Sequence, residues 1–372
     1  MSHPSPFFSF FPQFTPDELN DKAWGEGFTD WKLIRELPES TQANFKPARG
    51  MYDPTDPNYL SILEEDLQAL SPHAGLALYH YFFDGRHVLN GFEQQLLSQR
   101  SRIPFFICWA NETWSKRWIG KPNEVIVEQR HDLNESVIRD HANYLSQLFA
   151  LEGYRHYHGQ PLLLIYNPQA SPTLNRALAL YRKAFSEIGC NPFIGACISH
   201  PQPEVHMISY DFGCEFEPRF FFNSFSQPNL AKAAARLKVA FPRFFEWLGA
   251  TRDGFRQKSG QREFIYAEYL EQLESGDLER RLRECVGSRA LMRSTFLRWN
   301  NTPRYRKRST VVAHRGVNAE YLSKIITTIQ SDDDLPLLVN SWNEWSEGAA
   351  LEAGECNHPL RQVFLAALGL KP

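Results

Sequence analysis

Leu337-Leu338-Val339-Asn340-Ser341-Trp342-Asn343-Glu344-Trp345-Ser346-Glu347-Gly348 is the stretch that decides the fold, because it turns abruptly from apolar to polar residues. An apolar run of strand length that ends in carboxylates, amides and indoles predicts a buried parallel strand whose carboxyl end opens into a site. We expect Glu344 and Glu347 to face a shared ligand there. A surface loop with solvated glutamates is the alternative until structural context is found.

The paired carboxylates indicate acid–base chemistry of the kind that cleaves acetals. Acetal cleavage needs one group that protonates a leaving oxygen and another that removes a proton or stabilises positive charge. Trp342 and Trp345 suit a carbohydrate ligand, since indole faces stack on the C–H faces of sugars, and Asn343 offers both a donor and an acceptor. The stretch therefore favours sugar chemistry.

Outward from this stretch, apolar runs of strand length recur along the chain. We expect strands at Phe7–Phe11, Gly75–Tyr81, Pro104–Ala110, Pro161–Tyr166, Phe193–Ile198, Met207–Phe212, Ala290–Leu297 and Leu335–Val339. Apolar residues at helical spacing predict helices between several of these strands. One helix is expected to start at Asp56-Pro57 and to carry Leu60, Leu63, Leu67 and Leu70 on one face. A second carries Leu178, Tyr181, Phe185 and Ile188 and ends at Gly189, and a third carries Tyr321, Leu322, Ile325 and Ile329. Alternating strands and helices predict a parallel sheet, and eight strands favour closure into a (β/α)₈ TIM-like barrel over an open sheet.

The chain carries no G-x-G-x-x-G or G-x-x-x-x-G-K-[ST] loop, so phosphate-cradling nucleotide folds are disfavoured. The long segments Pro12–Asn58 and Gly213–Phe264, the second with a helical stretch around Leu230–Leu248, are interpreted as elaborations of one barrel. No Gly/Ser-rich linker separates them from the rest. We therefore expect one domain over residues 1–372.

Catalytic residues of barrel enzymes follow the carboxyl ends of strands. The exits of strands two, three, seven and eight each place an aromatic beside a polar group, and the sixth leads to Asp211, Glu215, Glu217 and Arg219. Besides the catalytic pair, the predicted substrate-binding residues are Tyr79, His80, Tyr81, Asn111, Glu112, Trp114, Trp118, Glu215, Trp299, Asn300, Arg304, Trp342 and Asn343. Packing is the alternative for His80 and the tryptophans, and a surface ion pair with Arg117 or Lys116 for Glu112.

Composition excludes other classes of function. The net charge of −3 with a pI near 6.5 gives no basic footprint for nucleic acid. The 6 cysteines show neither a disulfide framework nor zinc-site spacing, and no H-E-x-x-H or G-x-S-x-G occurs, so we expect no metal, no cofactor and no serine triad. Without a signal-like segment or an apolar run of membrane length, the expected location is cytoplasmic.

Several motifs together resemble a known family. These are Pro12-Gln13-Phe14, Trp24-Gly25-Glu26-Gly27-Phe28-Thr29-Asp30-Trp31, Cys108-Trp109-Ala110-Asn111-Glu112-Thr113-Trp114, Trp299-Asn300-Asn301-Thr302-Pro303-Arg304 and Asn343-Glu344-Trp345-Ser346-Glu347-Gly348. Their order resembles the WbsX polysaccharide-biosynthesis family, which is related to glycoside hydrolase family 99, the endo-α-mannosidases. The resemblance implies a (β/α)₈ barrel that acts on glycans.

The resemblance also implies catalytic roles for Glu344 and Glu347. Glu344 matches the base that deprotonates a sugar 2-hydroxyl to form a 1,2-anhydro intermediate, and Glu347 matches the acid that protonates the leaving oxygen. An acid in that role is expected to have a raised pKa. The chain departs from the family pattern at Thr15, where histidine is usual, and at Ala353, where proline often stands.

These observations favour a retaining endo-glycosidase or transglycosylase of bacterial surface polysaccharide (O-antigen or capsule) metabolism, with an oligosaccharide or polysaccharide as substrate. A glycosyltransferase of lipopolysaccharide or O-antigen biosynthesis is one alternative, although nothing resembles a nucleotide-sugar site. A non-catalytic glycan-binding barrel is the other.

Overall fold

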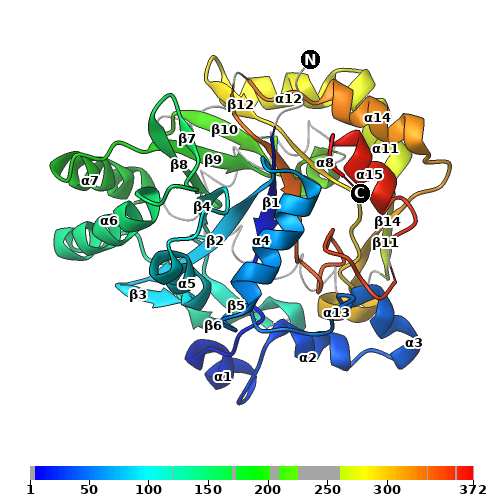
Figure 1. Cartoon of the computed structure of the whole chain (residues 1–372), viewed down its shortest axis with the longest axis horizontal. Helices are drawn as coiled ribbons and strands as arrows, with labels where there is room; N and C mark the ends of the chain where they lie inside the picture. The colour runs from blue at the N-terminus through cyan, green and yellow to red at the C-terminus, as the bar shows by residue number, and fades with distance from the viewer. Residues whose placement is uncertain are drawn as a thin grey trace.

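Parallel strands form a closed ring at the centre of the computed structural model (Figure 1). The structure describes residues 5–119, 121–169, 173–201, 209–224, 260–332, 334–356 and 358–371, without the side chains of Trp118 and Pro122. The ring follows the order β12-β10-β9-β8-β4-β2-β1-β15-β13, and every neighbouring pair is parallel. Its strands are β1 (Pro6–Phe10), β2 (Gly75–Phe83), β4 (Phe105–Trp109), β8 (Gln160–Ile165), β9 (Phe193–Ile198), β10 (Phe212–Glu215), β12 (Ala290–Met292), β13 (Ser294–Phe296) and β15 (Leu337–Asn340).

One broken strand closes the ring. β12 and β13 are separated only by Arg293, and they pair with different neighbours: Met292 stands beside Cys214 of β10, whereas Ser294 stands beside Leu338 of β15. The expected strand Ala290–Leu297 is therefore two short strands that share one position. Counted this way, the ring has eight positions within the described part of the chain, and the predicted TIM-like (β/α)₈ fold is confirmed.

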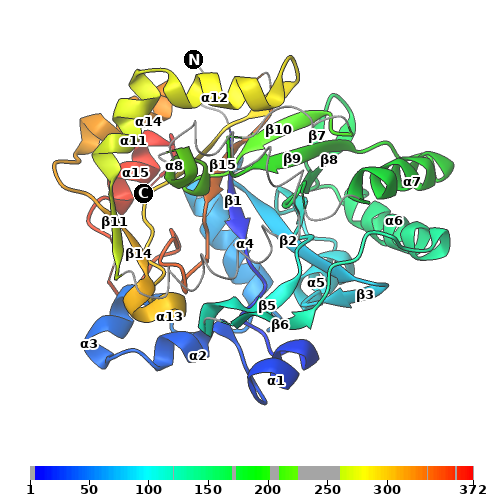
Figure 2. The same cartoon turned by 180° about the vertical axis from the view of Figure 1, so that it is seen from behind.

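Helices surround the ring in both views (Figures 1 and 2). The described helices are α1 (Glu18–Trp24), α2 (Asp30–Arg35), α3 (Glu39–Gln42), η1 (Ala43–Phe45), α4 (Tyr59–Leu70), α5 (Gly91–Gln99), η2 (Arg117–Ile119), α6 (Glu135–Phe149), α7 (Leu174–Glu187), α8 (Arg219–Ser224), α11 (Tyr266–Glu274), α12 (Asp277–Val286), α13 (Thr302–Tyr305), η4 (Arg306–Arg308), α14 (Ala319–Thr328) and α15 (Arg361–Ala367). None of them is long and apolar enough to cross a bilayer.

The expected amphipathic helices form because their apolar residues share one face. Leu60, Leu63, Leu67 and Leu70 of α4 are all buried. The helix begins at Tyr59, not at Pro57, because the Asp56 carboxylate accepts a hydrogen bond from the Asn58 backbone (2.8 Å) and closes a turn before it. The expected apolar residues of α7 and α14 are also buried, with two exceptions. Ile188, just beyond α7, is 37 % exposed, and Tyr321 of α14 is half-buried.

One expected strand is misplaced. The sixth strand begins at Phe212, where the predicted Met207–Phe212 segment ends; Met207 itself lies outside the described residues. Asp211 consequently stands at the amino end of β10, where its carboxylate accepts hydrogen bonds from the Ile194 backbone and the Arg182 side chain. It is not an exit residue. The expected helix around Leu230–Leu248 also lies outside the described residues.

Short elements gather beyond the carboxyl ends of the ring strands. α1, α2, α3 and α13 lie along one edge together with the antiparallel pair β5 (Trp114–Lys116) and β6 (Lys121–Val127), as both views show (Figures 1 and 2). The remaining strands are β3 (Arg86–Val88), β7 (His156–Tyr157), β11 (Arg262–Ile265) and β14 (Thr310–Ala313). The Pro12–Asn58 segment thus packs on the barrel as an elaboration and brings α2 over the exit of β15.

Candidate functional site

Arg304 joins the two predicted catalytic glutamates. Its Nη1 lies 2.9 Å from Glu347 Oε1 and its Nη2 lies 3.3 Å from Glu344 Oε1. The Nη2 atom also lies 2.7 Å from Asp30 Oδ2. The Glu344 side chain is 3 % exposed and that of Glu347 is 10 % exposed. Side chains from the exit of β15, from α13 and from α2 therefore meet around one guanidinium.

Burial controls the electrostatics of this cluster. It raises the pKa of Glu344 to about 7, against the opposing charge of Arg304 and with the help of Glu347 and Asp30. Burial alone would lower the pKa of Arg304, but the three carboxylates outweigh it and hold that pKa well above its usual range. Glu344 is thus poised to exchange a proton near neutral pH, and because the two glutamates interact they titrate as a pair.

Two neutral side chains complete the environment of Glu344. Gln13 Nε2 donates to both carboxylate oxygens, at 3.0 and 2.9 Å. The Ser346 hydroxyl lies 2.9 Å from Glu344 Oε1 and also contacts Asp30. With Arg304, these donors orient the carboxylate and leave it few free lone pairs.

The loop that carries the glutamates is fixed from several sides. Asn343 is fully buried, and its side-chain amide pairs with the backbone N–H and C=O of Phe11 at 2.8 and 2.9 Å. The Asn300 backbone donates to the Glu347 carbonyl at 2.8 Å. Gly348 has a φ of +59°, and a Cβ there would lie 2.7 Å from the Asn300 carbonyl oxygen, so only glycine fits. Asn343 and Asn300 therefore position the glutamates.

A second set of side chains interacts electrostatically with the pair. Burial raises the pKa of Glu112, while Arg219 and Arg117 oppose the shift. Burial also raises the pKa of Tyr81 well above its usual value, and the charges of Glu344 and Glu112 add to it. Tyr81 thus interacts electrostatically with Glu344, and Glu112 with Glu347.

The predicted aromatic residues line the ring interior and its exits. Tyr79 contacts Phe11 with 4.1 Å between ring centroids and the rings tilted by 39°, and Trp114 contacts the rings of Tyr81 and Phe83 edge-on at 5.1 and 5.2 Å. Trp114 is half-buried, which leaves part of its surface accessible. Trp299 and Trp342 are 5 % and 2 % exposed, so packing accounts for most of their surface. Trp345 is also buried, and its indole donates to Glu352 at 2.9 Å.

Three predicted residues do not join the cluster. His80 points away from the ring interior, with Nδ1 2.9 Å from Glu93 on α5 and Nε2 2.8 Å from His141 on α6. This follows from the alternation of side chains along a strand, because Tyr79 and Tyr81 occupy the inner face of β2. The other two are Asn111, whose amide binds the backbone N–H and C=O of Asn167 at 2.8 Å each, and Glu215, which is buried 2.9 Å from Arg293. The side chain of Trp118, also predicted to bind substrate, lies outside the described residues.

Sequence reasoning missed several members of the cluster. Gln13 and Asp30 lie in the motifs that carry the family resemblance; Gln13 stands just beyond the carboxyl end of β1, and the long segment after it delivers Asp30. Thr15, a departure from the family pattern, lies outside the cluster and contacts Asp53 at 3.1 Å and Thr55 at 3.4 Å. The other departure, Ala353, is exposed, and its carbonyl accepts from the Ala48 backbone.

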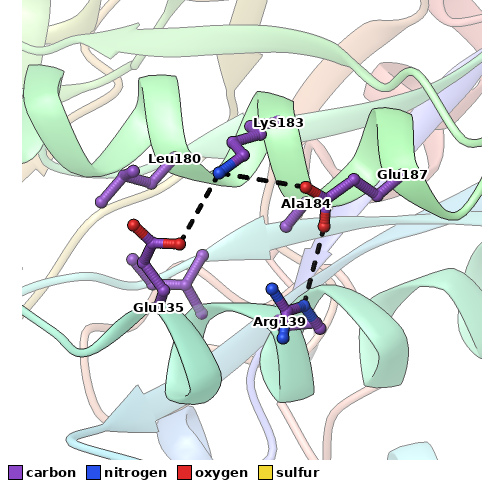
Figure 3. A pocket seen from close by; sticks show the side chains of 7 residues that line it. Glu135, Arg139, Leu180, Lys183, Ala184 and Glu187 are labelled. Atoms are coloured by element: carbon purple, nitrogen blue, oxygen red, sulfur yellow. Dashed lines mark ion pairs between the residues drawn. The ribbon is translucent and has the colours of Figure 1, made fainter.

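A groove elsewhere on the molecule has no link to this cluster. It lies between α6 and α7, encloses about 10 Å³, and is crossed by ion pairs of Lys183 with Glu135 and Glu187 and of Arg139 with Glu187 (Figure 3). Its size is near the minimum for a single water molecule. Within the described ranges, no group of three or more His, Cys, Asp or Glu side chains is arranged to hold a metal ion.

The fold and the site define a (β/α)₈ barrel protein with buried acidic residues at the carboxyl ends of its strands. Similar folds occur among solved structures. Two structures of the GH99 endo-alpha-mannosidase of Bacteroides thetaiotaomicron match with TM-scores of 0.52 and 0.54 at 12 % identity, covering 98 % of this chain and 95 % and 96 % of theirs. A glycoside hydrolase-like protein matches with a TM-score of 0.53 at 10 % identity, covering 99 % of this chain and 93 % of its own. At these identities the likeness is one of fold.

The chain belongs to the WbsX glycosyltransferase family, whose model matches residues 7–366. Two uncharacterized WxcX proteins, from strains B100 and ATCC 33913 of Xanthomonas campestris pv. campestris, are 28 % identical over 364 residues. The match covers 92 % of this chain and 46 % of each relative, so the chain spans about half the length of the curated relatives it matches.

Proposed function

We propose that this protein is a glycosidase or transglycosylase of bacterial surface polysaccharide metabolism that cleaves an internal glycosidic bond with retention. The observation that carries the proposal is the shared contact of Glu344 and Glu347 with Arg304. Two carboxylates held at one cation can act on one sugar residue, and the aromatic side chains nearby suit the C–H faces of a sugar.

Glu344 is proposed as the base. Its pKa of about 7, set mainly by burial, lets it accept a proton near neutral pH, where general bases are most effective. In the proposed route it removes the proton of the sugar 2-hydroxyl, whose oxygen attacks C1. Gln13, Ser346 and Arg304 hold it in place.

Glu347 is proposed as the acid. It is the more exposed of the two side chains, and its partners on the site side include Arg304 and, electrostatically, Glu112. It would donate its proton to the leaving glycosidic oxygen as the bond to C1 breaks. Tyr81, Glu112, Trp114 and Arg304 are proposed to contact the sugar, with Tyr79, Trp299 and Trp342 shaping the site behind them. His80, Asn111, Asn343 and Glu215 are left out of this set, since protein groups already occupy their polar atoms.

Glycosyl transfer is the second candidate, because the family description is that of a glycosyltransferase. A glycosyltransferase would take the sugar from an activated donor, not from a glycosidic bond of the polymer. A melting temperature that rises with the concentration of a sugar nucleotide would favour this candidate, and the absence of any shift with common sugar nucleotides would count against it.

The first test is turnover by Glu344→Gln and Glu347→Gln. The assay uses surface polysaccharide purified from the source bacterium, with products sized and their anomeric configuration measured by NMR. We expect each variant to fold normally and to lose roughly 100- to 10,000-fold in rate, the usual contribution of a general acid or base.

Glu352→Gln is the matched control. Glu352 is also buried with a pKa raised by burial to about 7, but Tyr52 and Trp345 bind it outside the cluster. It should keep most of its activity. Full activity in both Glu344→Gln and Glu347→Gln would overturn the assignment, and glycan binding without cleavage by the unmodified protein would identify a non-catalytic barrel.

A further inference from the structure

Arg219 is a second arginine at the site, and its position is fixed by the structure around it. It begins α8, directly after the exit of β10, and the Phe221 backbone N–H anchors this turn to the Glu217 carboxylate at 2.9 Å. The guanidinium carbon lies 6.0 Å from the centre of the Tyr166 ring, which follows β8. Arg219 is half-buried, and the charges of Glu347 and Glu112 act on its guanidinium.

The two arginines of the site differ in their partners. Arg304 is engaged by Asp30, Glu344 and Glu347 within 3.3 Å. Arg219 forms no hydrogen bond or ion pair with any of the residues that the structure describes, although Glu347 and Glu112 act on it at longer range. A guanidinium has five N–H donors, and leaving them without partners in a partly desolvated site is unfavourable.

The local charge balance leaves room for an added anion. The carboxylates that act on Arg219 belong to Glu347 and Glu112, and Glu347 is already bound to Arg304. Burial raises the pKa of Glu112 and that of Glu344, which reduces the negative charge that these two groups carry near neutral pH. Three arginines, at positions 117, 219 and 304, interact with Glu112. An incoming carboxylate would therefore meet a cation that no described carboxylate binds directly.

We propose that Arg219 binds a carboxylate of an acidic sugar in the substrate, next to the bond that Glu344 and Glu347 cleave. A planar guanidinium pairs with a carboxylate through two parallel hydrogen bonds, which gives direction as well as energy. The Tyr166 ring lies 6.0 Å from the guanidinium carbon and contributes a cation–π contact. The inference rests on the proposed function, since it assigns the class of sugar to that same site, and it makes Arg219 a specificity-determining residue.

The experiment measures binding, so it does not depend on turnover. Methyl glycosides of glucuronic, galacturonic and mannuronic acid are compared with those of glucose, galactose and mannose, which differ by a CH₂OH in place of the carboxylate. Dissociation constants come from ligand-detected NMR titration with the intact protein. We expect at least one uronate to bind roughly 10- to 100-fold more tightly than its neutral partner, as hydrogen bonds to a charged group allow.

Arg219→Gln should abolish that preference and leave the weaker binding of the neutral sugar unchanged. Arg219→Lys keeps the charge but not the paired geometry, and should retain only part of the preference. Arg280→Gln, an exposed position on α12, is the control for the change in net charge. The melting temperature of each variant verifies its fold.

The outcomes separate this inference from the proposed function. Equal binding of every uronate and its neutral partner, or a preference that survives Arg219→Gln, overturns the carboxylate assignment and leaves Glu344 and Glu347 untouched. If Arg219 acts only as a counter-charge to Glu347 and Glu112, its replacement changes the melting temperature but not the preference for uronates. That result also overturns the carboxylate assignment. Absence of binding by all six sugars overturns the carboxylate assignment, whereas the proposed function is decided separately by the turnover of Glu344→Gln and Glu347→Gln.

Discussion

At the scale of single residues, the site depends on how burial and hydrogen bonds compete for one carboxylate. Burial raises the pKa of Glu344 to about 7, whereas Arg304 and Gln13 favour its charged form. If Glu344 is the base, activity requires the charged form, so kcat/KM should fall as the pH is lowered through about 7.

Gln13→Leu should move this acidic limb to higher pH. The substitution removes the amide that donates to both oxygens of Glu344, so the charged form loses stabilisation and the pKa rises further, by roughly one unit. The measurement is the pH dependence of kcat/KM. Gln68→Leu, on the exposed side of α4, should leave the profile unchanged. A limb that stays in place or moves to lower pH would show that Glu344 is not the titrating base.

At the scale of elements, side-chain amides join the exits of neighbouring strands. Asn343, after β15, pairs with both backbone polar groups of Phe11, after β1. Asn111, after β4, pairs in the same way with Asn167, after β8. Each amide replaces the strand pairing that ends at the rim of the ring; the backbone groups that Asn343 satisfies are buried, and those that Asn111 satisfies are partly buried.

Asn343→Ala should lower the free energy of unfolding by roughly 2–4 kcal/mol, because two buried backbone groups lose their partners, and Asn111→Ala should lower it by less, because Asn167 is half-buried. Denaturant titration followed by fluorescence measures the change. Asn58→Ala is the control, since that side chain binds Asp56 at the surface, and it should change stability by less than about 0.5 kcal/mol. Losses no larger than the control's would mean that water replaces the amides without cost.

At the scale of the whole molecule, ring closure depends on a buried ion pair. Arg293 separates β12 from β13, and its side chain is 4 % exposed, with Nε 2.9 Å from the fully buried Glu215. The Ser294 backbone also donates to Glu215, at 3.0 Å. The carboxylate thus binds both the guanidinium and the backbone at the break between β12 and β13, where the strand changes its neighbour from β10 to β15.

Arg293→Met should destabilise the protein by about 3–5 kcal/mol, because it leaves the Glu215 charge buried without its cation. Adding Glu215→Gln to that variant should recover part of the loss, since no uncompensated charge remains. Thermal unfolding of the single and double variants gives the coupling between the two positions. Strictly additive effects would show that the pair does not act as a unit in closing the ring.

The fold could be predicted further than the site. Apolar runs and amphipathic stripes identify buried strands and helices locally, so Phe193–Ile198 and the buried face of α4 appear in the structure as expected. The sixth strand was misplaced because Phe212–Glu215 is short and contains glycine, whereas the apolar residues before it resemble a strand. The break at Arg293 depends on pairing with two different strands, and no local pattern contains that information.

The sequence by itself determined that this chain alternates strands with helices, that eight strand positions close a ring, and that Glu344 and Glu347 follow the last of them. Only the tertiary structure decided which polar side chains reach those glutamates. Asp30 and Arg304 meet there although 274 residues separate them, whereas His80 faces the outer helices. The physical reason is that apolar periodicity is encoded locally, but contacts at the ring mouth depend on loop paths and on the face to which each strand residue points.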